Sequence, residues 1–307
     1  MAERPGGARS RESGEDVVMA PVIAVTGASG QIGGRVARRL AEAGAAQRLV
    51  GRDPSRLPEL TGATPAPPAT YADGEAMRRA LDGATALFLV SARESADRVR
   101  EHISVVDAAV AAGVHRVVYV SFLSAAPDAT FTFARDHWHT EQHIRDSGLR
   151  HTFLRDSLYL AGLPAMVGPD GIIRGPAGDG RVSAVAHADI ADAAAAVLLG
   201  GDAHDDLTYD LTGPEAITLT EAAAVLTRFT GRPIGYVPET RDEAYASRAR
   251  YDAPAWEMAG WVTSYEAIAT GEMSKVSNAV PMLTGRPAQN LAGWLTTHPQ
   301  SWSHLKP

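Results

Sequence analysis

Three glycines at three-residue spacing are the first residues whose pattern indicates ligand binding. Gly27, Gly30 and Gly33 follow the apolar run Val22–Val25, which is typical of a parallel strand buried on both faces. In such a turn one glycine permits the tight bend, a second lets the backbone approach a pyrophosphate, and a third lets helix and strand pack closely. The pyrophosphate would lie at the N-terminus of the helix that begins near Gly30. The order of strand, turn and helix therefore predicts dinucleotide binding.

Arg52 follows the predicted second strand, Arg48–Val50, at the place where the adenosine ribose of a dinucleotide is recognised. An acidic residue there takes the 2′-hydroxyl of NAD, whereas an arginine can pair bidentately with the 2′-phosphate of NADP. Arg52 therefore favours NADP as the cofactor. The adjacent Asp53 leaves NAD as an alternative, and a further interpretation is that the two residues form a solvated turn.

More polar residues lie where predicted strands end. Ser91 and Ser121 end the fourth and fifth predicted strands, and Arg155 and Tyr159 follow the sixth. Because open α/β sheets bind ligands at the carboxyl edge of their strands, we expect Ser91, Ser121 and Arg155 to contact the cofactor. Tyr159 is expected to line the substrate pocket as a catalytic residue. The alternatives are turn residues that only form hydrogen bonds and, for Tyr159, packing in the core.

The composition limits the class of protein. The 307 residues suffice for one large α/β domain or for a nucleotide domain with a smaller lobe, and 45% apolar and 21% charged residues are ordinary for a soluble enzyme. The formal charge of −7 offers no attraction for nucleic acid. No stretch approaches the roughly 18 apolar residues of a membrane span. The absence of cysteine excludes thiol nucleophiles and disulfides, and it is consistent with the cytoplasm, where we expect the protein.

The segment 1–20 is polar and rich in Gly, Arg and Glu, and it lacks the apolar core of a secretory signal. We interpret it as a disordered leader, with Met19 as a candidate for the original start of the chain.

Predicted strands and helices alternate through the first half of the chain. The strands are expected at 22–25, 48–50, 86–90, 117–120 and 151–154, with a weak one ending near Thr70-Tyr71. The helices are expected at 31–43, 75–81, 96–112 and 137–147, and the apolar face of helix 96–112 is expected to consist of Val99, Ile103, Val106 and Val110. This alternation predicts an α/β fold, a Rossmann-type doubly wound parallel sheet with right-handed crossovers.

The alternation stops beyond Leu160. Short strands are expected at 172–174 and 181–186, a helix at 187–199, a strand at 207–211 that returns to the main sheet, and mainly helices from Thr218 onward. We predict a nucleotide-binding domain over 21–160, completed by about 187–212. The segments 161–186 and 213–307 are predicted to form a smaller, mainly helical cap over the substrate.

Several ordered motifs give the chain a family resemblance. They are Thr26-Gly27-Ala28-Ser29-Gly30-Gln31-Ile32-Gly33, Ser121-Phe122-Leu123, Ser147-Gly148-Leu149, Leu154-Arg155-Asp156, Ala188-Asp189-Ile190-Ala191 and Leu283-Thr284-Gly285-Arg286-Pro287. With these the sequence resembles the NmrA-like atypical short-chain dehydrogenase/reductases, and within them the type 2 NAD(P)H:quinone oxidoreductases. The resemblance implies a Rossmann domain whose residues Thr26, Gly27, Ser29, Gly30, Gln31, Ile32 and Gly33 bind a nicotinamide dinucleotide.

The chain also departs from its relatives. The Tyr-x-x-x-Lys pair of the wider superfamily is absent, because the only lysines are Lys275 and Lys306 and neither follows a tyrosine by four residues. In many relatives a lysine precedes the family glutamate by four residues. Here His137 takes that place and Glu141 is retained. Thr70 stands where relatives carry an acidic residue that contacts adenine.

The two histidines of segment 137–139 are the candidates for a proton donor. An imidazole can donate a proton near neutral pH, and the resemblance places His137 and His139 at the substrate end of the cofactor. On a helix the two positions point about 200° apart, so both cannot face one cleft. We expect His137 to be catalytic and His139 to face solvent. No third ligand is suitably spaced, so no metal site is predicted, and ordinary surface histidines are the alternative.

The sequence thus predicts an NADPH-dependent reductase that transfers hydride to a planar conjugated acceptor such as a quinone. The hydroquinone anion has low proton affinity, so a dedicated Tyr–Lys acid is dispensable. One alternative is a non-catalytic sensor of the NADP(H) ratio, and another is a tailoring reductase of an aromatic or polyketide-like metabolite. The expected partner is a small planar substrate, without nucleic acid or membrane, and a homodimer is one oligomeric state that we consider.

Overall fold

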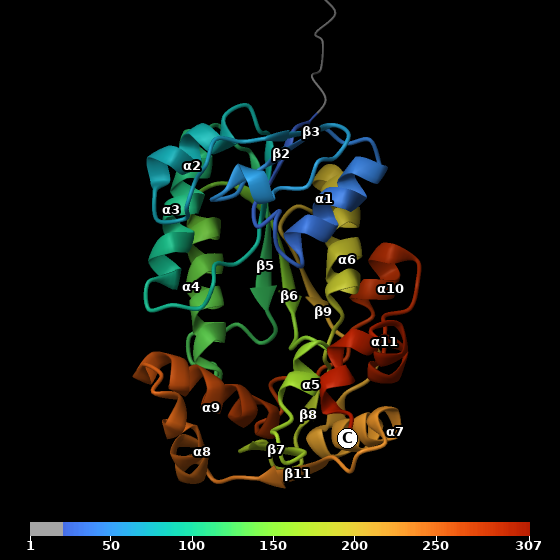
Figure 1. Cartoon of the computed structure of the whole chain (residues 1–307). Helices are drawn as coiled ribbons and strands as arrows, with labels where there is room; N and C mark the ends of the chain where they lie inside the picture. The colour runs from blue at the N-terminus through green and yellow to red at the C-terminus, as the bar shows by residue number, and fades with distance from the viewer. Residues whose placement is uncertain (1–20) are drawn as a thin grey trace, which may run out of the picture.

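A seven-stranded, all-parallel sheet organises the computed structural model, which describes residues 21–307 (Figure 1). The predicted leader, residues 1–20, lies outside the described residues. The order in the sheet is β3-β2-β1-β4-β5-β6-β9. The strands are β1 (Ile23–Val25), β2 (Gln47–Leu49), β3 (Ala63–Pro65), β4 (Ala86–Leu89), β5 (Arg116–Phe122), β6 (Arg150–Asp156) and β9 (Leu207–Leu211). The predicted doubly wound Rossmann-type fold is confirmed, including the return of β9 to the main sheet.

Helices cover both faces of this sheet, as a doubly wound fold requires. On one face lie α2 (Gly74–Leu81), α3 (Arg98–Ala111) and α4 (Thr132–Asp146), and on the other lie α1 (Gly33–Glu42), α6 (His187–Leu199) and α10 (Ala279–Thr284) (Figure 1). The central strands β4 and β5 are buried along their whole length because both of their faces are covered. Predicted and observed helices agree within two residues at each end, except for α4.

Helix α4 begins at Thr132, five residues before the predicted start at His137. The additional turn is stabilised by tertiary packing, because Phe133 is buried against the Phe131 ring and against Trp256 of a distant helix. Single-sequence patterns do not contain such a contact between distant segments.

The third strand is also placed differently from the prediction. It lies at Ala63–Pro65, not at a position ending near Thr70. Pro67 and Pro68 have no amide hydrogen to donate, so the segment that follows β3 cannot continue a strand ladder. The chain instead returns to the sheet through single hydrogen bonds, such as that from the Ala69 amide to the Gly51 carbonyl at 3.2 Å. Thr70 is exposed and lies five residues beyond the end of β3.

Helix α3 turns a different face toward the core than predicted, because Val106 is the only one of its four predicted core residues that is buried. Val110 is 45% exposed, and Val99 and Ile103 are only partly buried. The buried side chains are those of Arg98, His102, Val105, Val106, Ala108 and Ala109. The physical reason is that Arg98 and His102 find hydrogen-bonding partners in the interior, which offsets the cost of their burial.

The remaining elements form a lower lobe that faces the carboxyl ends of the strands (Figure 1). Two small sheets pair β8 with β10 and β7 with β11. The lobe contains α5 (Gly162–Ala165), β7 (Ile172–Gly175), β8 (Arg181–Val182), β10 (Ile217–Thr218), α7 (Leu219–Thr230), β11 (Gly235–Pro238), α8 (Arg241–Arg248), α9 (Ala255–Ala269) and α11 (Leu291–Thr297). Its hydrophobic core is separate from the two cores that flank the main sheet. The division of the chain into a nucleotide-binding domain and a cap remains our proposal, and it follows these cores.

Within residues 21–307, no helix combines the length and the apolar character that crossing a membrane would need.

Candidate functional site

The glycine-rich turn after β1 is held by hydrogen bonds around one threonine. Thr26 donates from its amide and its hydroxyl to the Phe88 carbonyl of β4, at 3.0 and 3.1 Å. The same hydroxyl oxygen accepts from the Val90 amide at 2.9 Å and from the Tyr71 hydroxyl at 2.7 Å. Thr26 therefore fixes the loop to the neighbouring strand by its side chain and does not face outward. Tyr71 was not among the predicted site residues, because nothing local to its sequence indicates this distant contact.

The three glycines of the turn have different tasks. Gly27 adopts φ +61°, in the left-handed region that favours glycine, and its carbonyl accepts from the Gly30 amide at 2.8 Å. At Gly33 an added Cβ atom would lie 2.5 Å from the Thr26 carbonyl oxygen, so only glycine lets α1 approach β1 this closely. At Gly30 an added Cβ would meet only the Gly27 carbonyl, at 3.2 Å, and otherwise open space. Gly30 thus leaves the free surface that a pyrophosphate needs.

The N-terminus of α1 fits an anionic group. Within the described residues, no side chain caps this helix and no acidic residue occupies its first turn. Arg35 follows on the same helix, and burial, together with the nearby charges of Arg38 and Arg39, lowers its pKa. A positive helix end without a competing carboxylate is a suitable pyrophosphate site. Ser29 and Gln31 are exposed beside it and Ile32 is buried beneath it.

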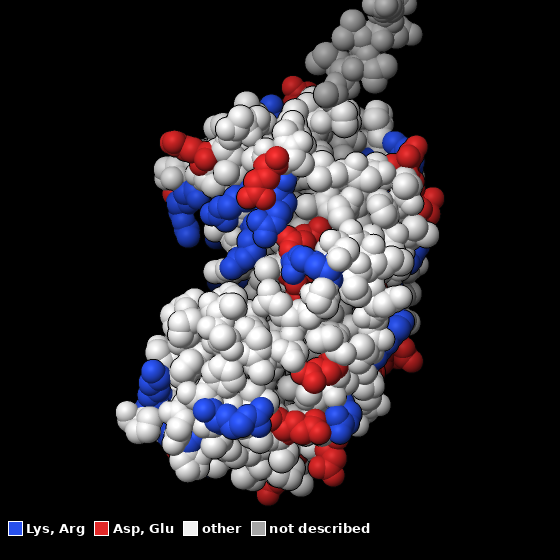
Figure 2. Space-filling model, turned by 90° about the vertical axis from the view of Figure 1, so that its right-hand side faces the viewer, with Lys and Arg blue, Asp and Glu red and all other residues white. Residues whose placement is uncertain are grey.

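The loop after β2 separates Arg52 from its acidic neighbour. Asp53 caps a short helical turn, Pro54–Arg56, by accepting from the amide and the hydroxyl of Ser55 at 3.0 and 2.7 Å. These hydrogen bonds hold the pKa of Asp53 below its usual value. Arg52 is exposed, and Figure 2 shows that basic side chains gather on the upper part of the face it draws, beside a notch between the upper and lower parts. The carboxylate is thus engaged locally while the guanidinium is accessible.

Ser121 and Arg155 are joined by a buried carboxylate. Glu141 of α4 is fully buried and accepts from the Ser121 hydroxyl at 2.6 Å. Arg155 donates to both of its carboxylate oxygens, at 2.8 and 2.6 Å, and Arg145 adds a longer contact at 3.3 Å. This network joins β5, α4 and β6 at the carboxyl edge of the sheet. Because Ser121 and Arg155 are already paired with Glu141, their contact with the cofactor stays a prediction, as does that of the partly buried Ser91.

His137 does not lie open to a cleft as expected, because its side chain is only 4% exposed. Arg98 donates to its Nε2 at 3.2 Å, and its Nδ1 is 2.9 Å from the Tyr119 hydroxyl. A guanidinium can only donate, so Nε2 accepts and the ring proton sits on Nδ1. Burial and the adjacent Arg98 charge both hold the pKa of His137 well below its usual value. The side chain is therefore a neutral, buried imidazole, which argues against its predicted role as a proton donor. His139 is exposed, as expected.

His102 completes this buried polar cluster and links it to the loop after β4. Its Nε2 accepts from the Ala92 amide at 2.7 Å, so its Nδ1 carries the proton and donates to Thr140 at 2.8 Å. Burial lowers the pKa of His102 to about 3, which keeps it neutral. Arg98 also holds the Ala92 carbonyl, at 3.0 Å. Arg98 and His102 thus position the segment next to Ser91. In the sequence, the spacing of four residues between Arg98 and His102 could have indicated a buried polar face of α3. The apolar residues on another face of the helix obscured this pattern.

Tyr159 forms a pair with an aspartate at the carboxyl end of β6. Its hydroxyl donates to Asp156 at 3.0 Å, and its ring lies 4.3 Å from that of His187. Asp156 is 1% exposed, and burial raises the pKa of its carboxyl to about 8. At neutral pH this carboxyl holds a proton at the edge where ligands of such sheets bind. Asp156 was not predicted as a site residue, because its protonation depends on burial that the sequence pattern does not contain.

Within residues 21–307 there is no group of three or more His, Asp or Glu side chains that could hold a metal ion.

Comparisons with known proteins agree with this geometry. A family model described as NAD(P)H-binding matches residues 27–200. The (4-alkanoyl-5-oxo-2,5-dihydrofuran-3-yl)methyl phosphate reductase of Streptomyces griseus is 35% identical, over 92% of this chain and 99% of its own length. Quinone oxidoreductase 2 of Escherichia coli is 33% identical over 92% of this chain and 98% of its own. The crystal structure of an NADPH-dependent quinone oxidoreductase from Escherichia coli, complexed with NADPH, superimposes with a TM-score of 0.80 at 33% identity, covering 92% of this chain and 99% of that one.

Proposed function

The chain belongs to the NAD(P)H-binding, NmrA-like family of oxidoreductases, and from this premise we propose that it transfers hydride from NADPH to a planar conjugated acceptor such as a quinone. That it is an NAD(P)H-dependent oxidoreductase follows from the family. The preference for NADPH is supported by Arg52, which is exposed, whereas the side chain of the adjacent Asp53 caps a short helical turn. The acceptor class is supported by the chemistry of the site.

The observation that carries this proposal is the lack of a strong acid among the predicted catalytic groups. His137 is buried and neutral, and the Tyr159 hydroxyl donates to Asp156 while burial raises the pKa of Tyr159. Lys275 is paired with Asp210 of β9, and Lys306 lies at the C-terminal end of the chain. Such a site suits an acceptor whose reduced form is a weak base, since a hydroquinone anion needs little help to gain a proton.

The bound cofactor supplies a hydride, and the overall change converts NADPH, a quinone and a proton into NADP⁺ and a hydroquinone. The residues of this chain bind and orient the reactants. The amides at the uncapped N-terminus of α1 would hold the pyrophosphate, Gly30 would leave room for it, and Arg52 would pair with the 2′-phosphate. Tyr159 borders the acceptor. The proton reaches the product from solvent.

A conjugated lactone is a second candidate acceptor, and it corresponds to a tailoring reductase. The name of the Streptomyces griseus relative describes an unsaturated, acylated lactone that carries a phosphate. Such a ring is also flat and conjugated, so it would suit the same site. A non-catalytic redox sensor is disfavoured, because both relatives above 30% identity are named for reductase activity.

The test is NADPH oxidation, followed at the nicotinamide absorbance, with panels of quinones, conjugated lactones and unactivated ketones. We expect turnover of quinones and none of the unactivated ketones. NADPH and NADH are compared at equal concentration to measure cofactor preference. A protein that binds NADPH but oxidises it with no quinone would contradict the quinone assignment, and turnover of the lactones alone would favour the tailoring reductase.

A further inference from the structure

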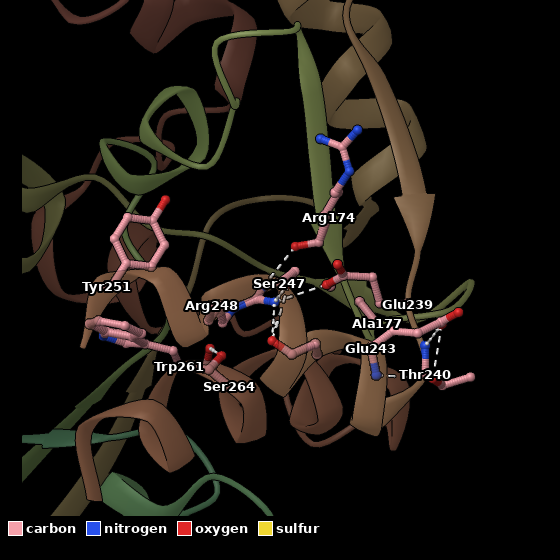
Figure 3. Close-up of polar contacts among 12 residues, drawn as sticks. Arg174, Ala177, Glu239, Thr240, Glu243, Ser247, Arg248, Tyr251, Trp261 and Ser264 are labelled. Atoms are coloured by element: carbon pink, nitrogen blue, oxygen red, sulfur yellow. Dashed lines mark hydrogen bonds and ion pairs between the residues drawn. The ribbon is translucent and has the colours of Figure 1, made fainter. Parts of the chain in front are cut away.

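The lower lobe contains a large cavity that no predicted site residue lines. Its volume is about 990 Å³, and α5, β7, α8 and α9 surround it (Figure 3). Ligand pockets of roughly 300–1,000 Å³ accept molecules of drug size, so this cavity is larger than a single quinone ring needs. Its wall begins at Gly162, whose amide donates to the Tyr159 carbonyl at 2.8 Å. The cavity therefore starts three residues after a tyrosine of the candidate acceptor site.

One side of the cavity is aromatic and apolar. Tyr251 and Trp261 lie next to each other, with ring centroids 5.9 Å apart and nearly perpendicular planes, and Figure 3 shows them across the cavity from Arg174 of β7. Met166 and Ile172 add apolar lining. Tyr251 is 58% exposed, which is unusual for so large an aromatic side chain. These surfaces suit the flat face of a conjugated ring.

Three arginines line the cavity, and two of them are neutralised by carboxylates. Arg248 donates to Glu239 at 2.9 Å and to the main-chain oxygen of Arg174 at 2.9 Å (Figure 3). Arg174 donates to both oxygens of Asp170, at 3.1 and 2.7 Å. These contacts compensate both charges and also fix the walls of the cavity.

The third arginine, Arg250, has no carboxylate partner within residues 21–307. Its guanidinium lies over the Tyr251 ring, 4.9 Å from the centroid, and donates to the Tyr251 hydroxyl at 2.9 Å. The aromatic ring holds the cation in place but does not neutralise it. A guanidinium of this kind pairs with a carboxylate, sulfonate or phosphate. The mouth of the cavity thus places an uncompensated cation beside an aromatic surface.

We propose that this cavity binds the non-reacting body of the acceptor, and that Arg250 selects acceptors whose flat apolar ring carries an anionic group. This inference rests on the proposed reductase function, because it assigns the substrate class of that same reaction. The aromatic pair binds the ring system, and Arg250 pairs with the anion at the rim. A neutral quinone of the same size contacts the aromatic pair but has no anion to pair with Arg250.

The test compares two acceptors of similar size, naphthoquinone sulfonate and its neutral methyl analogue menadione. Steady-state kcat/KM is measured for both in the wild-type protein, in Arg250→Gln and in Arg241→Gln. Arg241 lies on the same cap, pairs with Glu266 at 3.5 Å and does not line the cavity, so its variant controls for loss of one arginine outside the cavity. We expect the wild type and Arg241→Gln to prefer the sulfonate, after correction for the intrinsic reactivity of each quinone with free NADPH. Arg250→Gln should reduce that preference by roughly two- to fivefold, the scale of an exposed ion pair, and added salt should reduce it too.

A second variant separates the two contacts. Tyr251→Ala removes an exposed ring, so the fold should be retained, and it should lower kcat/KM for both quinones. Equal preferences in the wild type, Arg250→Gln and Arg241→Gln would overturn the inference while leaving the reductase function intact.

Direct binding distinguishes failure of the inference from failure of the proposed function. A redox-inactive naphthalene sulfonate is titrated into each variant, with quenching of tryptophan fluorescence as the readout. Weaker binding to Arg250→Gln than to Arg241→Gln supports an anion-selective cavity even if no quinone is reduced. Unchanged binding in both variants contradicts it.

Discussion

The candidate cofactor site and the cavity of the lower lobe are built on different principles. The cofactor side, at the carboxyl ends of β1, β4, β5 and β6, relies on backbone: glycines without a Cβ, an uncapped helix end and a threonine turned inward. The cap side relies on side chains, because its cavity is lined by aromatic rings and arginines brought together from four elements. In our proposal, local chain geometry sets cofactor binding, whereas acceptor choice depends on side chains that substitution can change without altering the fold.

The largest effect on stability and NADPH binding is expected in the glycine-rich turn, where the backbone leaves no room for an added side chain. Gly33→Val should destabilise the protein and abolish NADPH binding, because even a Cβ would lie 2.5 Å from the Thr26 carbonyl oxygen. Gly30→Val should abolish NADPH binding but retain the fold, since its added atoms would enter the open space where the pyrophosphate binds. Thermal unfolding and NADPH titration of both variants measure the two effects separately.

Gly162→Ala is the control, because a Cβ there meets nothing within 4 Å. If Gly30→Val still bound NADPH with native affinity, the cofactor would have to bind elsewhere. The glycine-rich turn would then not be the cofactor site.

The second effect concerns the buried carboxyl at the end of β6. Its pKa rises from 3.8 to about 8 on folding, because burial disfavours the charged form. A raised folded-state pKa contributes stability that is full below pH 3.8 and is lost as pH rises to about 8, at up to about 1.4 kcal/mol per pH unit. Asp156→Asn cannot ionise, so its stability should fall less steeply in this window. Urea unfolding across the pH range measures the difference, and parallel curves for both proteins would show that Asp156 ionises freely.

The third effect tests side-chain recognition on the cofactor side. Arg52→Ala should weaken NADPH binding by about 1.5–3 kcal/mol, the scale of a hydrogen bond to a charged group, and leave NADH binding nearly unchanged. Isothermal titration with both cofactors provides the measurement. Equal losses for NADPH and NADH would mean that Arg52 does not contact the 2′-phosphate.

The smallest effect is expected at His137. A buried, neutral imidazole does not supply the acceptor with a proton, so His137→Gln should reduce quinone turnover by roughly tenfold or less, below the 10²–10⁴-fold of general acid catalysis. The pH dependence of kcat should keep its shape. An inactive variant with native NADPH affinity and native stability would instead make His137 an obligatory acid.

Much of the upper part of the molecule could be predicted from sequence because its signals are local. Continuous apolar runs identified the central strands, and the glycine spacing after β1 identified the turn whose φ and close contacts the structure shows. Helix α6 was predicted at 187–199 and is observed at His187–Leu199. In each case the residues that decide the conformation are neighbours along the chain.

What only the tertiary structure decided depends on partners distant in sequence. The buried face of α3 follows Arg98 and His102, which form hydrogen bonds with the Ala92 main chain and with α4, and the early start of α4 follows packing against Trp256. The protonation of Asp156 and the uncompensated charge of Arg250 likewise depend on burial and on which carboxylates lie near. A sequence determines which groups a chain has, but the free energy of a buried or charged group depends on the atoms that folding places around it.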